Sequence, residues 1–306
     1  MSTIQPNLDL PLSEFLALTP GTVPFLVEPF LPAGGVVFLH GPTSVGKSPL
    51  TWAIATAVSN GGHCFGFPVL QTGKVLYIEL DTPAHLLHPR LTLLETLPTQ
   101  FHLSVFNHTI NILALRPEDG DRLRTLSETL NPALVIVNTL RKSHELDDKD
   151  SEVPARIYTA WRMIFPSSTL MFVHHDKKDP SSDVTSNPDQ AFSGSQAWAN
   201  DAQVALHITR GQKVRGPADE EGHSYERTRV TVKMTKSQVS DHERFHPISL
   251  QLSSDGTNWI EAGPVAYRKY FLGLDPIYTR AKRIQMTIDQ FEVGKSSVYE
   301  AVRGLA

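Results

Sequence analysis

One segment of the chain combines two glycines, a lysine and a serine at a spacing suited to phosphate binding. Residues 41–48 satisfy the pattern G-x-x-x-x-G-K-[ST] in full. In this pattern the glycines let main-chain N–H groups curl around phosphate oxygens, and the start of the following helix favours an anion. A chance glycine turn is the plainer alternative. The pattern predicts a phosphate-binding loop (P-loop) and nucleotide contacts from Gly41, Pro42, Thr43, Ser44, Val45, Gly46, Lys47, Ser48 and Pro49.

Three positions of the P-loop have distinct expected roles towards a nucleoside triphosphate. We expect Lys47 to contact the β- and γ-phosphates and Ser48 to bind Mg²⁺ through its hydroxyl. Pro49 falls in the first turn of the following helix, where its missing N–H costs little. The implied cofactors are therefore ATP and Mg²⁺.

Polar residues at the ends of two predicted strands are candidates for the metal and for the attacking water. Asn138 follows the strand 133–137 and offers a carbonyl oxygen without charge, or else is a plain turn residue. Glu79 and Asp81 lie two residues apart, so both could face the nucleotide from one side of a strand. We expect one of these acids to orient or deprotonate water, and Asp81 also to serve the metal. The alternative is that one or both are solvated acids at the end of a strand.

Two histidines, His174 and His175, end a further predicted strand. Open α/β sheets bind ligands at the carboxyl ends of their strands, so a polar group there could sense the γ-phosphate. A structural role is the alternative, since lone histidines are more often structural.

The elements that must position these residues alternate between short apolar runs and helical segments. Alternation of this kind predicts right-handed βαβ units and a parallel sheet. The expected strands are 36–40, 75–80, 133–137 and 170–174. The expected helices are 50–58 and 153–164, with a loop and helix at 81–94. Strands dominate later, at 203–209, 228–235 and 247–252, which predicts a β-rich edge. The prediction is an α/β fold with a mostly parallel central sheet in a domain of residues 1–262, after an irregular lead-in at 1–33.

The C-terminal part, 263–306, is predicted to be a linker at 263–274 followed by a small helical segment at 278–305. Between Arg268 and Arg303 it holds seven Lys/Arg against four Asp/Glu. Residues 294–299 open a helix much as recognition helices of helix-turn-helix units open. Lys295, Ser296, Ser297 and Arg303 would then contact DNA. A plain packing helix is the alternative.

Composition sets few limits on function. The net charge of −4 says nothing overall about nucleic acid, so DNA binding has to rest on local basic residues. The lone cysteine, Cys64, excludes an internal disulfide, fits a reducing cytosol and reads as a small core residue. No apolar run is long enough to span a bilayer, and no signal peptide is evident. We therefore expect a cytoplasmic protein without a membrane partner.

These features together resemble the RecA-like hexameric ATPases, and most closely the plasmid RepA replicative helicase family. The resemblance runs from Pro24 to Leu252. It rests on Leu-Pro-Ala-Gly-Gly at 31–35, the P-loop, Val-Leu-Tyr-Ile at 75–78, Arg-Leu at 90–91, Val-Ile-Val-Asn-Thr-Leu-Arg-Lys at 135–142, Phe-Val-His-His at 172–175 and Ser-Gly-Ser at 193–195.

The resemblance implies a ring of about six subunits, with ATP between neighbours and single-stranded DNA in the centre. Asp81 falls at the position of the family's catalytic glutamate, Asn138 at that of its metal-associated aspartate, and His175 at that of its γ-phosphate sensor. Lys236 resembles a lysine that reaches a neighbour's phosphates. DNA-facing loops fall at 141–150 and 177–190, with Arg141, Lys142, Lys177 and Lys178 as the basic residues.

Departures from the family pattern keep two functions open. Besides Asp81 and Asn138, Gln238 replaces an arginine finger and Gln203 another arginine, with Lys233 and Arg229 as candidate substitutes. Loss of a finger costs several powers of ten in turnover. The leading hypothesis is a DNA-dependent ATPase of helicase type, with replication or recombination proteins as further partners. The alternative is a weakly hydrolysing or non-hydrolysing ATP switch or loader that bridges DNA and proteins.

Overall fold

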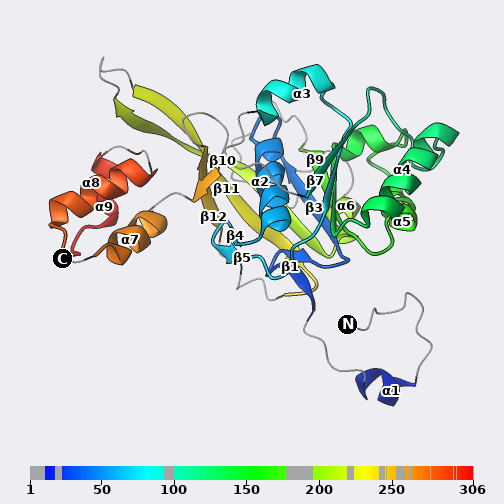
Figure 1. The fold of residues 1–306 in the computed structure, drawn as a ribbon, viewed down its shortest axis with the longest axis horizontal. Helices are drawn as coiled ribbons and strands as arrows, with labels where there is room; N and C mark the ends of the chain where they lie inside the picture. The colour runs from blue at the N-terminus through cyan, green and yellow to red at the C-terminus, as the bar shows by residue number, and fades with distance from the viewer. Residues whose placement is uncertain are drawn as a thin grey trace.

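The computed structural model describes residues 11–17, 23–92, 100–176, 196–218, 224–240, 245, 247–252, 259–261, 264–275, 277–291, 293 and 295–305. Its centre is a nine-stranded sheet of order β13-β12-β11-β10-β3-β9-β8-β6-β7 (Figure 1). The strands are β3 Val36–Gly41, β6 Val75–Glu79, β7 Phe101–Val105, β8 Leu134–Asn138, β9 Thr169–His175, β10 Val204–Ala218, β11 Ser224–Ser237, β12 Ile248–Leu252 and β13 Trp259–Glu261.

The six strands from β10 to β7 pair in parallel, whereas β10 to β13 pair antiparallel. This confirms the predicted α/β fold with a mostly parallel sheet and a β-rich edge. Parallel neighbours bring all their carboxyl ends to one edge of the sheet. His40, Asn138 and His174 therefore reach the same edge as Glu79, although they lie far apart in the sequence.

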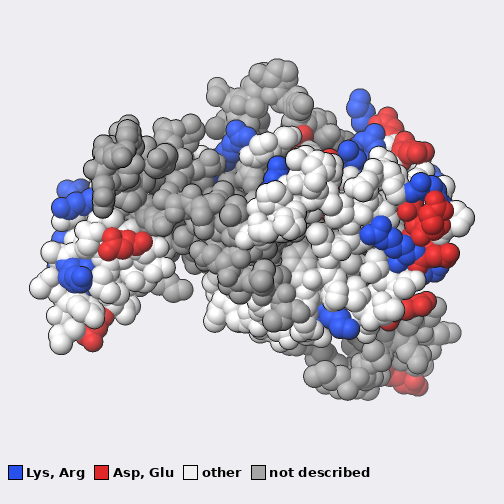
Figure 2. All heavy atoms as spheres, turned by 45° about the horizontal axis from the view of Figure 1, so that its top comes forward, with Lys and Arg blue, Asp and Glu red and all other residues white. Residues whose placement is uncertain are grey.

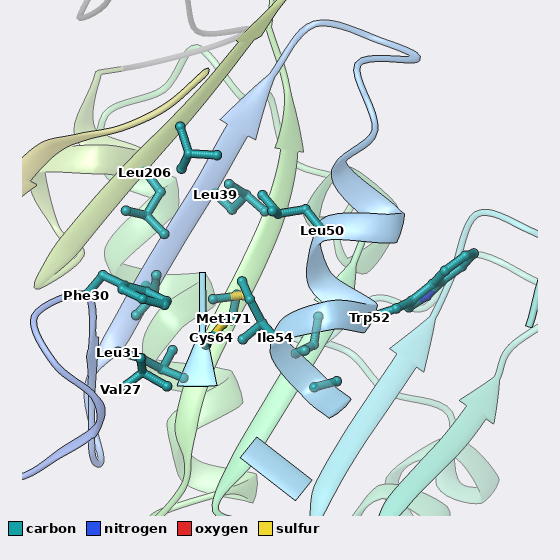
Figure 3. Close-up of a cluster of buried hydrophobic side chains, with 14 of the residues drawn as sticks. Val27, Phe30, Leu31, Leu39, Leu50, Trp52, Ile54, Cys64, Met171 and Leu206 are labelled. Atoms are coloured by element: carbon teal, nitrogen blue, oxygen red, sulfur yellow. The ribbon is translucent and has the colours of Figure 1, made fainter. Parts of the chain in front are cut away.

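Helices cover both faces of the sheet. On one face lies α2 (Lys47–Asn60), and on the other lie α4 (Pro117–Leu130), α5 (Val153–Ile164) and the short α6 (Ala197–Asn200). Alternation along the strands divides the apolar side chains between two cores: Leu39 packs with the α2 side, and Phe38 with the α5 side. Figure 3 shows Leu39, Met171 and Leu206 from three strands meeting Leu50 and Ile54 of α2. The strand that leads to the P-loop is thus held rigidly on both sides.

Further short elements surround this core. They are α1 Leu12–Ala17, β1 Phe25–Val27, β2 Leu31–Pro32, β4 His63–Cys64, β5 Phe67–Pro68, α3 Ala84–Leu91 and the 3₁₀ helix η1 Leu140–Ser143. Cys64 is buried and free, as expected of a small core residue. Among the described residues, no helix has both the length and the apolar character needed to cross a membrane.

The structure corrects the sequence prediction at the C-terminus. Three helices occupy it, α7 Pro264–Gly273, α8 Arg280–Phe291 and α9 Lys295–Ala301. The stretch 263–274, predicted as a linker, forms α7 because Tyr267 and Phe271, four residues apart, bury one helix face in a shared apolar core. The sequence prediction also lacked β7 and α4. β7 lies at the edge of the sheet with His102 and Leu103 exposed, so it shows no continuous apolar run.

Candidate functional site

The P-loop connects β3 to α2 at the carboxyl edge of the sheet. Its shape depends on left-handed backbone at Ser44 (φ 59°) and Gly46 (φ 98°). Gly46 is also pressed against Trp259 of β13, since a Cβ atom there would lie 2.5 Å from the indole ring. Only glycine meets both conditions at this position.

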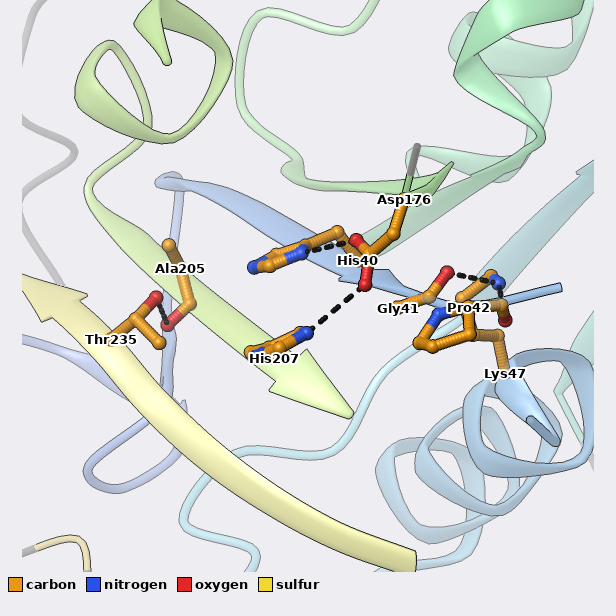
Figure 4. Close-up of polar contacts among 8 residues, drawn as sticks. All are labelled: His40, Gly41, Pro42, Lys47, Asp176, Ala205, His207 and Thr235. Carbon is orange, nitrogen blue, oxygen red and sulfur yellow. Dashed lines mark hydrogen bonds and ion pairs between the residues drawn. The ribbon is translucent and has the colours of Figure 1, made fainter. Parts of the chain in front are cut away.

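Lys47 lies at the start of α2 and is 5% exposed. Its Nζ donates hydrogen bonds to the carbonyl oxygens of Gly41 at 2.8 Å and Pro42 at 2.7 Å, which Figure 4 shows as an ammonium folded back onto its own loop. Burial lowers the pKa of Lys47 to about 8, against the opposing effect of the Asp176 carboxylate. The lysine therefore keeps its proton at neutral pH and can exchange these carbonyls for phosphate oxygens.

A cavity of about 340 Å³ opens beside the P-loop. It brings together eight residues that the sequence singled out, which are Ser44, Gly46, Lys47, Ser48, Pro49, Asp81, Asn138 and His175. The rest of its lining is Trp52, which the sequence did not single out, and Arg90 and Thr139, which it noted only as part of the resemblance. Residues from β8, β9, α2, α3 and the turn after β6 thus converge on one space, as strand ends of a parallel sheet do.

Glu79 and Asp81 do not face the same way. β6 ends at Glu79, so the strand geometry that would align the two acids stops before Asp81. Glu79 is fully buried outside the cavity lining: Oε2 accepts from Asn138 Nδ2 at 2.8 Å, and Oε1 accepts from the main-chain N–H groups of Asp81 and Thr82. Burial raises the pKa of Glu79, while these hydrogen bonds oppose the rise.

Asn138, 4% exposed, connects Glu79 to the P-loop. Its Nδ2 also lies 3.5 Å from Ser48 Oγ. Ser48, Asn138 and Asp81 all line the cavity, and each carries a side-chain oxygen, which is the donor chemistry that Mg²⁺ takes. The residues present therefore fit the metal implied by a P-loop.

Asp81 is open to solvent and pairs with a basic residue of the neighbouring loop. Its carboxylate lies 3.4 Å from Lys142 Nζ, and both side chains are 45% exposed. Arg141 turns elsewhere: it contacts the Asp148 carboxylate at 3.0 Å and the His144 carbonyl. Of the two basic residues after β8, Lys142 is the one tied to the acid in the cavity.

The structure separates the two histidines that end β9. His174 is 1% exposed, and its ring packs near Phe38 and Trp198. These contacts correspond to the structural alternative given for the two histidines. His175 lines the cavity, where burial first and then the Lys47 charge lower its pKa to about 4. His175 is therefore neutral at pH 7 and can donate one hydrogen bond to a phosphate oxygen.

A buried His–Asp–His cluster lies directly beneath the P-loop and was not evident from the sequence. Asp176 accepts from His40 Nδ1 at 2.8 Å and His207 Nε2 at 3.1 Å, and the two imidazoles stack 4.3 Å apart (Figure 4). Burial acts to raise the pKa of Asp176, but hydrogen bonds from His207 and His40 lower it to about 2. The Asp176 N–H also donates to the Gly41 carbonyl, which anchors the start of the P-loop.

Other predicted residues lie away from the cavity of their own chain. Lys236 Nζ donates to the carbonyls of Ala199, Asn200 and Ala202 at the end of α6. Gln203 Oε1 accepts from the Val36 N–H at the opposite end of β3. The expected contact of Lys236 with the phosphates bound to a neighbouring subunit stays a prediction.

Three further sets of predicted residues have other surroundings. Arg229 contacts the Tyr267 hydroxyl of α7, so it faces the C-terminal helices. Its role as a substitute finger towards a neighbouring subunit stays a prediction. Lys295 begins α9, and Arg303 lies in the turn that follows this helix. Lys177, Lys178 and the stretch 193–195 lie outside the described residues.

Two comparisons with known proteins are informative. The family model AAA_25, described as an AAA domain, matches residues 5–181. The chain is also similar to the crystal structure of a KaiC-like protein from the hyperthermophilic archaeon Pyrococcus horikoshii OT3. That similarity has 12% sequence identity and a TM-score of 0.49, and it covers 77% of this chain and 93% of the other.

Proposed function

The chain belongs to the AAA domain family of P-loop ATPases, and on that premise we propose that it is a DNA-dependent ATPase of replicative helicase type that acts on single-stranded DNA. The observation that carries this proposal is the cavity beside the P-loop. It holds Lys47, Ser48, Asp81, Asn138 and His175 together although they come from distant parts of the sequence. The order of these residues along the chain also supports membership of the plasmid RepA group.

Each of these five residues has a proposed role that its surroundings support. The main-chain N–H groups of the P-loop and Lys47 bind the polyphosphate. Ser48 and Asn138 would hold Mg²⁺, which when bound neutralises charge on the β- and γ-phosphates. Asp81, with a solvent-exposed carboxylate, orients the attacking water, and His175 contacts the γ-phosphate as a neutral donor.

The contact between Asp81 and Lys142 offers a physical basis for dependence on DNA. The Lys142 ammonium attracts the Asp81 carboxylate, which is the group proposed to orient the attacking water. The Lys142 side chain is also exposed enough to contact a DNA phosphate instead. A strand of DNA that takes Lys142 would release Asp81 to the water. Stimulation by DNA then follows from a competition between two anions for one cation.

A ring of about six subunits completes the proposal. Among its lining residues, the cavity has two cations, Lys47 and Arg90. The proposal adds a third cation from a neighbouring subunit, which would stabilise the charge of the transition state. Lys236 is the residue proposed for that contact. It would have to leave the carbonyl oxygens at the end of α6 to make it.

A weakly hydrolysing or non-hydrolysing ATP switch or loader is the second candidate. The observation in its favour is Asn138, which brings an amide to the place where P-loop ATPases commonly have a carboxylate. Such a protein would bind ATP tightly and release phosphate only negligibly, with or without DNA.

Phosphate release with and without single-stranded DNA tests the two candidates against each other. The proposal predicts salt-sensitive DNA binding, DNA-stimulated turnover and a loss of turnover larger than the loss of ATP affinity in Asp81→Asn. Turnover that DNA does not change, together with DNA binding that salt does not weaken, would refute it. Unchanged turnover in Asp81→Asn would remove Asp81 as the group that orients water. A mass measurement of the oligomer checks the ring.

A further inference from the structure

The C-terminal helical unit, α7 to α9, has an apolar core of its own. None of its members belongs to the two cores of the sheet; they are Ala266, Tyr267, Phe271, Ile284, Ile288, Phe291, Val293, Val298 and Val302. Among the described residues, polar contacts from Arg229 to Tyr267 and from Gln251 to the Phe291 carbonyl attach the unit to the edge of the sheet. Figure 1 shows the three helices at one end of the molecule, beyond β12. The unit thus presents an outer surface that the catalytic core does not need.

Its last two helices have the connection of a helix-turn-helix. α8 ends at Phe291 and α9 begins at Lys295, so three residues join them, and the third in sequence is Gly294. Val293, the described residue of this connection, is fully buried in the core of the unit. A connection of three residues that includes glycine is a sequence feature of this motif.

The two sides of α9 differ in chemistry. Val298 of α9 and Val302 of the turn after it are buried, whereas Lys295, Ser296, Tyr299 and Glu300 of α9 and Arg303 of that turn are exposed. The ammonium of Lys295 lies 5.4 Å and the guanidinium of Arg280 6.0 Å from the centre of the Tyr299 ring. Arg280 is held there by the carbonyls of Val302 and Leu305. The exposed surface around α9 therefore combines a serine, an aromatic ring, one carboxylate and the cations of Lys295, Arg280 and Arg303.

The charge of this unit is opposite to that of the rest of the chain. Between Arg268 and Arg303, seven Lys/Arg stand against four Asp/Glu, a net of +3; since the whole chain carries −4, the remainder carries −7. In Figure 2, Lys and Arg side chains lie at the left end of the molecule, with Asp or Glu side chains beside them on the same face. A local positive charge on an acidic protein is the electrostatic footprint of a nucleic-acid site.

We propose that the C-terminal helical unit binds duplex DNA, with α9 against the major groove and Lys295 and Arg303 on backbone phosphates. The major groove of B-form DNA is wide enough for one helix, and hydroxyl and cationic side chains are the groups that contact base edges and phosphates there. Duplex is favoured over single strand because the exposed side chains lie along one helix with a single exposed aromatic ring, whereas single-strand sites are grooves lined with several stacking aromatic side chains.

Fluorescence anisotropy of a labelled duplex with the full-length protein, without nucleotide, tests this inference. The double variant Lys295→Ala/Arg303→Ala should lose roughly tenfold or more in duplex affinity at low salt, and the slope of log affinity against log salt should fall by about two. The matched control Arg124→Ala/Arg156→Ala removes the same charge from exposed positions of α4 and α5 and should bind the duplex like the wild type. Circular dichroism and melting temperature check that each variant is folded.

Three results would overturn the inference: no salt-sensitive duplex binding by the wild type, unchanged duplex affinity in the Lys295/Arg303 variant, or an equal loss in the control. A loss confined to single-stranded DNA would also overturn it and assign the surface to that ligand. Because the assay uses no nucleotide and a duplex, its outcome is independent of the proposed ATPase activity.

Discussion

The side-chain amide of Asn138 donates a hydrogen bond to the carboxylate of Glu79 across two neighbouring strands, at 2.8 Å. The two residues pair directly in the sheet, and each ends its strand. The negative charge that a P-loop site commonly has at the position of Asn138 therefore lies one strand away, and the amide connects it to Ser48. Glu79 is in this view a positioning residue: it fixes the Asn138 amide and supplies charge to the Mg²⁺ site without lining the cavity.

Exchanging the two side chains tests this relationship. Glu79→Gln should weaken the gain in ATP affinity that Mg²⁺ brings by about tenfold, since groups that orient metal ligands contribute at this level. Asn138→Asp alone places two carboxylates at hydrogen-bond distance and should be less stable than the wild type. The double variant Glu79→Gln/Asn138→Asp keeps one amide and one carboxylate and should recover most of the Mg²⁺ effect. Titration of a fluorescent ATP analogue with and without Mg²⁺ measures the Mg²⁺ effect in Glu79→Gln and in the double variant, and urea unfolding measures the stability of Asn138→Asp. A double variant with no larger Mg²⁺ effect than Glu79→Gln would contradict the exchange.

Removing the cation that pairs with Asp81 should uncouple turnover from DNA. Lys142→Ala frees the Asp81 carboxylate, so phosphate release without DNA should rise several-fold while stimulation by single-stranded DNA shrinks. Lys149→Ala is the matched control, because Lys149 is exposed in the same stretch and has no contact with Asp81 among the described interactions. A Lys142→Ala protein that keeps both basal and stimulated rates would show that this ion pair has no part in the response.

Alanine substitutions at two glycines with left-handed backbone distinguish the cost of backbone strain from the cost of a steric contact. Gly46 (φ 98°) meets Trp259, whereas Gly62 (φ 88°) has open space where a Cβ atom would lie. Gly62→Ala should lose about 1 kcal/mol of stability from strain alone. Gly46→Ala should lose more, because the methyl group must displace the indole, and its ATP affinity should fall as the P-loop shifts. Chemical unfolding and nucleotide titration of both variants check this; equal losses would mean that Trp259 does not support the loop.

The buried imidazole of His40 makes the fold sensitive to acid. Burial lowers the pKa of His40 to about 4, and hydrogen bonding to Asp176 only partly opposes this. As pH falls below 6.5, the ordinary pKa of histidine, His40 takes up a proton in the unfolded chain but stays neutral in the folded protein. The stability that this group contributes above pH 6.5 is therefore lost progressively down to about pH 4. The loss from this group is about 3 kcal/mol.

Urea unfolding of the wild type and His40→Asn across this pH range measures that loss. Asparagine can still donate to Asp176 but does not titrate, so the stability of the wild type relative to the variant should fall by about 3 kcal/mol between pH 7 and pH 4. A difference between the two proteins that stays constant with pH would contradict the account of the cluster.

Local sequence was sufficient for the P-loop and for the buried strands. Residues 41–48 can be predicted because phosphate binding constrains a contiguous segment. The strand 134–138 can be predicted because both faces of a buried parallel strand are apolar. The edge strand β7 lacked that signal. The helix α7 was hidden by Pro264 and Gly273 at its ends, which are also typical of a linker.

Pairings between distant strands were beyond the sequence. Glu79 and Asn138 are 59 residues apart, and His40 and Asp176 are 136 apart, so their contacts depend on the order of strands in the sheet. The sequence also placed Glu79 and Asp81 on one face of a strand. The chain leaves β6 between them, so one acid is buried as a support and the other opens into the cavity.

The most direct test of the whole account is a crystal structure with a non-hydrolysable ATP analogue and Mg²⁺. The β- and γ-phosphates should lie within the main-chain N–H groups of residues 41–48, with Lys47 Nζ moved from the Gly41 and Pro42 carbonyls onto phosphate oxygens. A triphosphate bound elsewhere, or a lysine that keeps both carbonyls while nucleotide is bound, would contradict it.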